Sequence, residues 1–174
     1  MTTETKLYWV ILATIWLVLK IIVASKKAKH YQRIRAAKKI YKNINKIKNS
    51  NEGWLIKYLR KIDPFVFEEL ILLSFKNKGY HIKRNKRYTH DGGIDGRISK
   101  NGEKFLIQAK RYSDYINEKH VRDFIEVCHE NKCKGFFIHT GKTGKETKEL
   151  LIKNSSIVII SGKKLFDLFI NESN

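Results

Sequence analysis

The sequence of 174 residues predicts an α/β domain with a mixed central sheet flanked by helices, preceded by one transmembrane helix. Three observations lead to this prediction. An apolar run of 18 residues lies near the start of the chain, three strand patterns follow one another in its middle, and helix and strand patterns alternate from Asn117 onward. Strands joined by tight turns pair antiparallel and β-α-β units pair parallel, so we expect the element order αβββαβαβα.

Residues 7–24 read LYWVILATIWLVLKIIVA and hold a single charge, Lys20, close to the end of the run. An apolar helix of about 20 residues crosses a bilayer core of ~30 Å, so we expect a transmembrane helix here, after a short external segment at residues 1–6. A cleaved secretory signal fits less well, because the basic residues follow the apolar run. A buried core helix is hard to cover in a domain of this size, and an interfacial helix would have a polar face.

The segment 25–53 is strongly basic and keeps a helical rhythm. Residues 26–48 hold ten Lys or Arg and no acid, and residues 1–50 carry a net charge of +11. Apolar residues such as Tyr31, Ile40 and Ile44 recur at helical spacing, which predicts an amphipathic helix that ends near Asn49–Gly53. The positive-inside rule places this segment and the domain after it on the cytoplasmic side of a bacterial inner membrane. Its basic face is expected on anionic lipid, with DNA phosphates or solvent as alternatives.

The remaining chain, residues 54–174, is expected to form the α/β domain. Asp63 is a typical helix N-cap, and Pro64 is typical of the first helical position. Gly79 is typical of a helix end. Asn101-Gly102 is a hairpin signal. Helix patterns begin at Trp54, Pro64, Asn117, Lys145 and Leu165. Strand patterns lie at 80–84, 94–98, 104–110, 135–140 and 157–160, the last two being buried.

The net charge and the two cysteines limit which partners and cofactors are expected. Residues 51–174 carry a net charge of +8, so polyanions are expected partners, although a lysine bias from an AT-rich genome gives the same excess. Cys128 and Cys133 match no zinc spacing with the nearby histidines, and Cys128 falls on an apolar helix face, which predicts a buried thiol. Gly141-Lys142-Thr143 lacks the spacing of a P-loop, so no nucleotide cofactor is expected.

Polar residues interrupt the apolar pattern at one end of the predicted hairpin. Asp95 lies in the second strand pattern, and strand alternation puts Gln108 and Lys110 on one face of the third. Counting back from the turn places Asp95 opposite Gln108 or Ala109. A carboxylate, an amide oxygen and an ammonium can then meet, which suits phosphodiester hydrolysis with Mg²⁺. An exposed hairpin with ordinary charges is the alternative.

The roles of these residues follow from their chemistry. Asp95 can bind Mg²⁺, with Mn²⁺ as a possible substitute, beside Gln108 or the Ala109 backbone carbonyl. Lys110 can orient the attacking water or stabilise the transition state. Glu68, near the start of the helix that begins at Pro64, can reach the site as a further ligand, directly or through water.

Four ordered motifs resemble the Mrr-like restriction endonuclease domain of the PD-(D/E)XK nuclease superfamily, over roughly residues 63–170. They are Phe67-Glu68, Gly79-Tyr80, Asp91-Gly92-Gly93-Ile94-Asp95 and Gln108-Ala109-Lys110-Arg111. The resemblance implies a restriction-endonuclease-like fold and a metal-dependent DNA endonuclease. It makes Asp95 the metal carboxylate, Lys110 the catalytic lysine and Glu68 the helix acid, and Gln108 takes the place of the acid usual in the superfamily.

Several assignments stay open at this point. Helix phase does not separate Glu68 from the adjacent Glu69, and His90 and Asp91 are expected only to shape their loop. Weak candidates for contacts to DNA phosphates are Arg111, Lys119, Arg122 and Lys142.

The N-terminus departs from the family pattern. Many Mrr-like proteins carry a winged-helix DNA-reading domain where this chain has a membrane span and a basic helix, so the target sequence and any methylation preference stay open. A homodimer is compatible with cutting both strands. The alternative function is a non-catalytic, membrane-tethered DNA-binding or scaffold protein with a nuclease-like fold.

Overall fold

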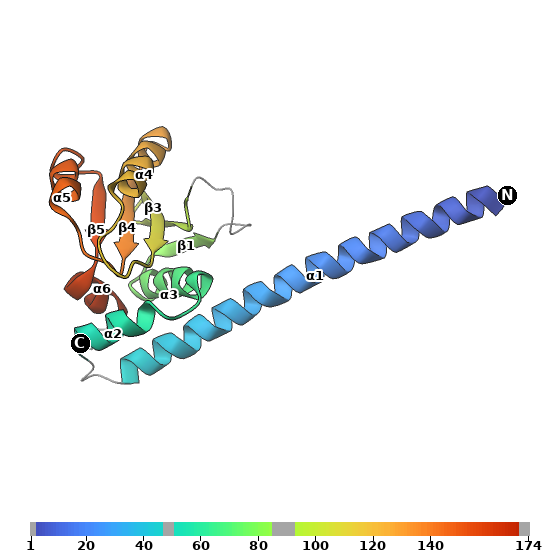
Figure 1. The fold of residues 1–174 in the computed structure, drawn as a ribbon, viewed down its shortest axis with the longest axis horizontal. Coiled ribbons are helices and arrows are strands. Elements are labelled where there is room, and N and C mark those ends of the chain that lie inside the picture. Colours follow the sequence, from blue (N-terminus) through green and yellow to red (C-terminus); the bar gives the residue numbers. More distant parts are fainter. Residues whose placement is uncertain (1–2, 47–50, 85–92, 171–174) are drawn as a thin grey trace.

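A five-stranded mixed sheet forms the centre of the structure, a computed structural model that describes residues 3–46, 51–84 and 93–170 (Figure 1). The strands lie across the sheet in chain order: β1 (His81–Arg84), β2 (Gly96–Lys100), β3 (Glu103–Lys110), β4 (Lys134–His139) and β5 (Ile157–Ile160). The first three pair antiparallel, whereas β3, β4 and β5 pair parallel. The predicted mixed sheet is therefore confirmed.

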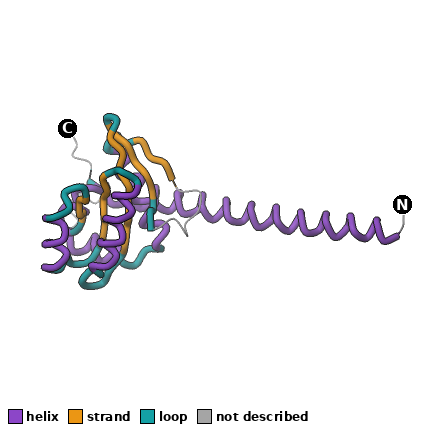
Figure 2. The backbone as a smooth tube through the Cα atoms, turned by 90° about the horizontal axis from the view of Figure 1, so that it is seen from above, coloured by secondary structure: helices purple, strands orange, loops and turns teal. Residues whose placement is uncertain are grey.

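Helices cover both faces of this sheet (Figure 2). They are α1 (Thr3–Lys46), α2 (Glu52–Leu59), α3 (Pro64–Asn77), α4 (Glu118–Glu130), α5 (Lys145–Ile152) and α6 (Gly162–Phe169). Residues of α1, α2, α3 and α6 share one hydrophobic core with one sheet face, and residues of α4 and α5 share a second core with the other. From α3 onward the order is αβββαβαβα, as predicted.

Two strand predictions differ in detail from the structure. Asp95 was expected inside the second strand, but β2 begins one residue later, at Gly96. The segment 157–160 was expected to be buried, yet Val158 on β5 is 42% exposed. The reason is that β5 is an edge strand of the sheet, so only part of it is covered.

Helix α3 forms as its sequence predicts. The Asp63 carboxylate accepts hydrogen bonds from the backbone N–H groups of Phe65, at 2.9 Å, and Val66, at 3.1 Å. This N-cap contributes about 1 kcal/mol by satisfying donors that the first helical turn leaves open. Gly79 follows the helix with a φ of +84°, the left-handed conformation that ends many helices.

The β2–β3 hairpin sets the register on which the site depends. Asn101 and Gly102 both have positive φ, at 52° and 82°, as a two-residue type I′ turn requires. The pairing aligns Gly96 with Ile107. Ile107 belongs to the core beneath α3 and Leu106 to the core beneath α4, so Gln108 and Lys110 follow Leu106 on the α4 face.

Helix α1 runs without interruption from the apolar N-terminal segment into the domain. Its last part packs on α3, and Ala37 and Ile44 are 1% and 2% exposed within the core, whereas Tyr31 is exposed rather than on the packed face. Its N-terminal part extends away from the domain in both views (Figures 1 and 2). The basic segment therefore contributes core residues to the α/β domain.

Among the residues that the structure describes, no helix combines the length and the apolar character needed to cross a membrane.

Candidate active site

A pocket of about 330 Å³ lies where α3, the start of β2 and the end of β3 meet. It contains the four residues predicted as catalytic: Glu68, Asp95, Gln108 and Lys110. The complete lining is Pro64, Glu68, Gly93, Asp95, Gln108, Ala109, Lys110, Arg111, Tyr112 and His120. The fold thus brings together four predicted residues that are up to 42 positions apart in the chain.

Backbone pairing holds Asp95 in the pocket. Its N–H donates to the Ile107 carbonyl at 2.8 Å, which extends the β2–β3 ladder by one residue. Its Oδ2 accepts a hydrogen bond from the Ala109 N–H at 2.6 Å. Asp95 therefore lies beside Gln108 and Ala109, as the count from the hairpin turn predicted.

The Gln108 side chain is 5% exposed and held in one orientation. Its Nε2 donates to the Gly93 carbonyl at 2.7 Å. Gly93 has a φ of +80°, and a Cβ built on it would lie 2.3 Å from Gln108 Nε2, so a larger residue here would displace the Gln108 amide. With Nε2 occupied in this way, Gln108 Oε1 is a buried acceptor without a hydrogen-bond partner among the described residues. Such an orphaned oxygen costs about 1–3 kcal/mol unless a ligand satisfies it.

Glu68 and Glu69 have different environments. Glu68 lines the pocket, and burial, together with the charges of Asp95 and Glu69, raises its pKa to about 8. Glu69 is 2% exposed and accepts a hydrogen bond from Arg84 Nε at 2.7 Å. The structure thus assigns Glu68 to the pocket and Glu69 to a buried ion pair between α3 and β1.

The donor set of the pocket fits a divalent cation of the Mg²⁺ or Mn²⁺ type. Two carboxylates repel each other there, and the orphaned Oε1 of Gln108 adds a neutral oxygen. Hard cations of this kind prefer oxygen ligands and keep several waters. Across the described ranges, no group of three or more His, Cys, Asp or Glu residues could hold a metal ion.

The two cysteines are free thiols in the structure. Cys128 is buried under β4 and Cys133 is half-buried. Burial raises the pKa of Cys128 to about 12, with a smaller effect of Cys133 in the same direction. The predicted buried thiol at Cys128 is confirmed.

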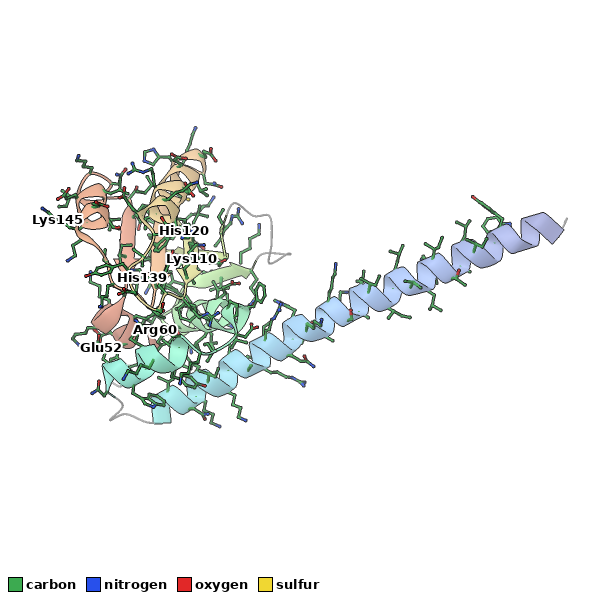
Figure 3. The ribbon with its side chains drawn as sticks, viewed as in Figure 1. Glu52, Arg60, Lys110, His120, His139 and Lys145 are labelled. Carbon is green, nitrogen blue, oxygen red and sulfur yellow. The ribbon has the colours of Figure 1, made fainter. Side chains whose placement is uncertain are left out.

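Lys110 is the last residue of β3 and lines the pocket, and His120 lies beside it (Figure 3). The sequence had suggested this histidine only as a possible zinc ligand. His120 Nδ1 lies 2.5 Å from the Tyr112 hydroxyl. Burial lowers the pKa of His120, and the charge of Lys110 lowers it further. One signal for this pair was present in the sequence, because Tyr112 follows Lys110 at the strand spacing of two and Asn117 caps the helix that carries His120.

Arg111 lines the pocket and also makes contacts within the domain, and its contact with a DNA phosphate stays a prediction. Its Nη1 donates to the backbone carbonyls of Arg60, at 2.9 Å, and Ile62, at 2.5 Å. Its guanidinium therefore holds the turn between α2 and α3, and Arg60 in turn donates to the Thr140 carbonyl at 2.7 Å. These hydrogen bonds join segments that are distant in the chain, so no local sequence pattern predicts them.

The other three candidates for phosphate contacts lie on the surface. Lys119 is exposed in the first turn of α4. Arg122 pairs with Glu118 one helical turn earlier, and Lys142 lies 3.4 Å from an Asp114 oxygen. Their contact with DNA stays a prediction. His90 and Asp91 lie outside the described residues.

Comparisons with known proteins agree with this architecture. The family model Mrr_cat, described as restriction endonuclease, matches residues 59–169. The solved structure of the MspJI restriction endonuclease in complex with a 27-mer oligonucleotide superposes with a TM-score of 0.53 and 22% identity, over 67% of this chain and 30% of that chain. The DNA modification-dependent restriction endonuclease AspBHI gives a TM-score of 0.53 and 19% identity, over 67% and 34%.

These structural matches span about a third of each enzyme and, at such identities, show the fold alone. No curated protein sequence matches the chain. The family model covers more than half of the chain, from the end of α2 to the end of α6. The chain therefore belongs to the restriction endonuclease family of Mrr-type catalytic domains, with a restriction-endonuclease-like α/β fold.

Proposed function

We propose that this chain is a DNA endonuclease that hydrolyses phosphodiester bonds with Mg²⁺, or with Mn²⁺ in its place. One observation carries the proposal: Glu68, Asp95, Gln108 and Lys110 line a single pocket. Membership of a restriction endonuclease family supports the nuclease class. The oligonucleotide and the dependence on DNA modification belong to MspJI and AspBHI, and they make DNA the substrate to test first.

The ion would be held by Asp95, Glu68 and the Oε1 of Gln108, with the Ala109 carbonyl as a further donor. Such an ion, when bound, lowers the pKa of water and neutralises charge on the scissile phosphate. Lys110 donates hydrogen bonds from its ammonium to the attacking water or to a phosphate oxygen, where negative charge grows in the transition state. Asp95 is kept in place by the Ala109 N–H, so little reorganisation is needed.

Plasmid nicking by the full chain tests this proposal. We expect nicking with Mg²⁺, no nicking with EDTA, and a loss of nicking in Lys110→Ala with DNA binding retained. Lys148→Ala on α5 is the matched control, because Lys148 is exposed and is not among the residues that line the pocket. If methylated and unmethylated plasmids both stay intact while the chain binds them, the function is the alternative, a non-catalytic DNA-binding scaffold.

We also propose that the N-terminal part of α1 tethers the domain to the cytoplasmic face of the inner membrane. Exposed apolar side chains support this proposal, since Trp9, Ile15, Trp16 and Ile21 are each about half exposed or more. Exposed apolar surface of this extent marks an interaction site. The basic residues that follow are suited to anionic lipid headgroups.

Cell fractionation tests the tether independently of cleavage. The full chain should sediment with the inner membrane, and Leu12→Glu with Leu19→Glu should release it, because a charge among these exposed apolar side chains opposes their burial in lipid. The exposed Tyr31→Glu, beyond the apolar segment, is the control. A full chain that stays in the soluble fraction would refute the tether and leave the nuclease proposal intact.

A further inference from the structure

A second concave surface, which we call the basic trough, crosses β1, β2 and β3 beside the pocket. It has a volume of about 400 Å³. On the α4 face its lining comes from alternate strand positions, which are His81, Lys83, Arg97, Ser99, Lys104 and Leu106. Asn131 and Cys133, which follow α4, form one wall. On the opposite face α3 packs beneath β1 and β2. The trough therefore lies on the side of the sheet away from α3.

The trough is positively charged. Lys83, Arg97 and Lys104 are exposed, and no acidic residue is among the described residues that line it. Burial raises the pKa of Cys133 and the positive charge of Arg97 opposes that shift, so Arg97 lies close to the α4 wall. Three cations in one concave surface favour an extended polyanion as the ligand.

Strand register connects the trough to the pocket. Arg97 pairs with Lys83 on one side and with Leu106 on the other. Gln108 lies two residues beyond Leu106 on β3 and, by alternation, on the same face, and Asp95 directly precedes Gly96, the first residue of β2. Two residues of a strand span roughly 7 Å, so the cations of the trough begin one row away from the carboxylate of the pocket.

The pocket itself explains why neighbouring cations matter. Asp95 brings a carboxylate to the place where a phosphate has to bind, and like charges repel. Cations on the adjacent strand row can hold the flanking phosphates of the same nucleic acid strand. Anionic lipid is a poorer match, because α1 packs against α3, in the core on the other side of the sheet.

We infer that the basic trough binds the phosphate backbone of DNA next to the bond that the pocket cleaves, with Lys83 and Arg97 as the principal contacts. The inference rests on the proposed endonuclease function. It assigns part of the DNA affinity to the β1–β3 face rather than to the basic helix α1.

Salt-dependent binding tests the inference. The full chain in neutral detergent is titrated with a short DNA duplex in EDTA, so that nothing is cleaved. Each lost phosphate contact lowers the slope of log K against log salt by roughly 0.9, which near 0.1 M salt is a loss of about eightfold in affinity. The variant Lys83→Gln with Arg97→Gln should therefore lower the slope by roughly 2 and the affinity by about 60-fold.

The matched control is Lys148→Gln with Lys153→Gln, which removes two exposed lysines at α5, beside the opposite edge of the sheet (Figure 1). The control should keep the slope of the unmodified chain. If the double variant loses its circular dichroism spectrum, Lys83→Gln alone serves, because this exposed side chain is not part of the core. Its slope should fall by roughly 0.9.

The outcomes separate the two proposals. A double variant with unchanged slope and affinity overturns the trough, whether or not the unmodified chain cleaves. Loss of binding to vesicles of anionic lipid with unchanged binding to DNA also overturns it. A reduced DNA slope together with an unmodified chain that never nicks plasmid would confirm the trough and refute the nuclease.

Discussion

Replacing Gly93 by alanine should disable the site while leaving the fold in place. A Cβ at this position would lie 2.3 Å from Gln108 Nε2, whereas ordinary contact begins at 3.4 Å. The Gln108 amide must therefore move by about 1 Å, and it loses its 2.7 Å hydrogen bond to the Gly93 carbonyl. The displaced group is the end of a flexible side chain, so the backbone can stay where it is.

Two separate effects determine how much cleavage rate and how much stability Gly93→Ala should lose. A displacement of about 1 Å at a catalytic group costs on the order of 100-fold in rate. The left-handed φ of +80° costs a non-glycine residue roughly 1–2 kcal/mol of stability. Gly102→Ala isolates the second effect, because Gly102 has a φ of +82° and nothing lies within 4 Å of its added Cβ.

Single-turnover nicking and urea unfolding of both full-length variants check this reasoning. Both should lose a similar free energy of unfolding, and only Gly93→Ala should lose cleavage. Equal nicking rates in the two variants would show that the Gln108 orientation does not matter for catalysis.

Three further predictions concern stability. Glu69→Gln should lower the free energy of unfolding by about 2–3 kcal/mol, because it breaks the buried ion pair with Arg84. Glu68→Gln is the comparison: it should abolish nicking and leave the unfolding midpoint unchanged. His139 is fully buried, and burial lowers its pKa to about 4. Between pH 6.5 and 4 the unfolded state therefore binds more protons than the folded state, so the free energy of unfolding should fall as the pH falls through that window. The loss should reach up to about 3 kcal/mol in the unmodified chain and should be smaller in His139→Gln. Removing residues 1–50 should lower the urea midpoint, because it uncovers the core that Ile44 seals; an unchanged midpoint would contradict this packing.

Local sequence rules predicted most of the fold. The Asp63 cap, the Asn101-Gly102 turn and the alternation along β3 each depend on neighbours within a few residues. The turn determines the register, and the register places Asp95 beside Gln108. The grouping of Asp95, Gln108 and Lys110 therefore follows from rules that can be applied without a structure.

Long-range packing decided what the same rules left open. Glu68 and Glu69 are adjacent in sequence, and only the position of β1, with Arg84, assigns Glu69 to an ion pair. The hydrogen bonds of Arg111 were also left open, because its partners, the carbonyls near the end of α2, lie about 50 residues away. Backbone carbonyls carry no signal in a sequence, so this contact was not predictable.

The sequence by itself determined the order of elements, the hairpin register and the identity of Asp95, Gln108 and Lys110 as a group, because helix caps, turns and strand alternation act over short stretches of chain. Only the tertiary structure decided that α1 contributes Ile44 to the core and that Gly93 orients the Gln108 amide. Those contacts depend on how whole elements pack against one another, which no local pattern of side chains records.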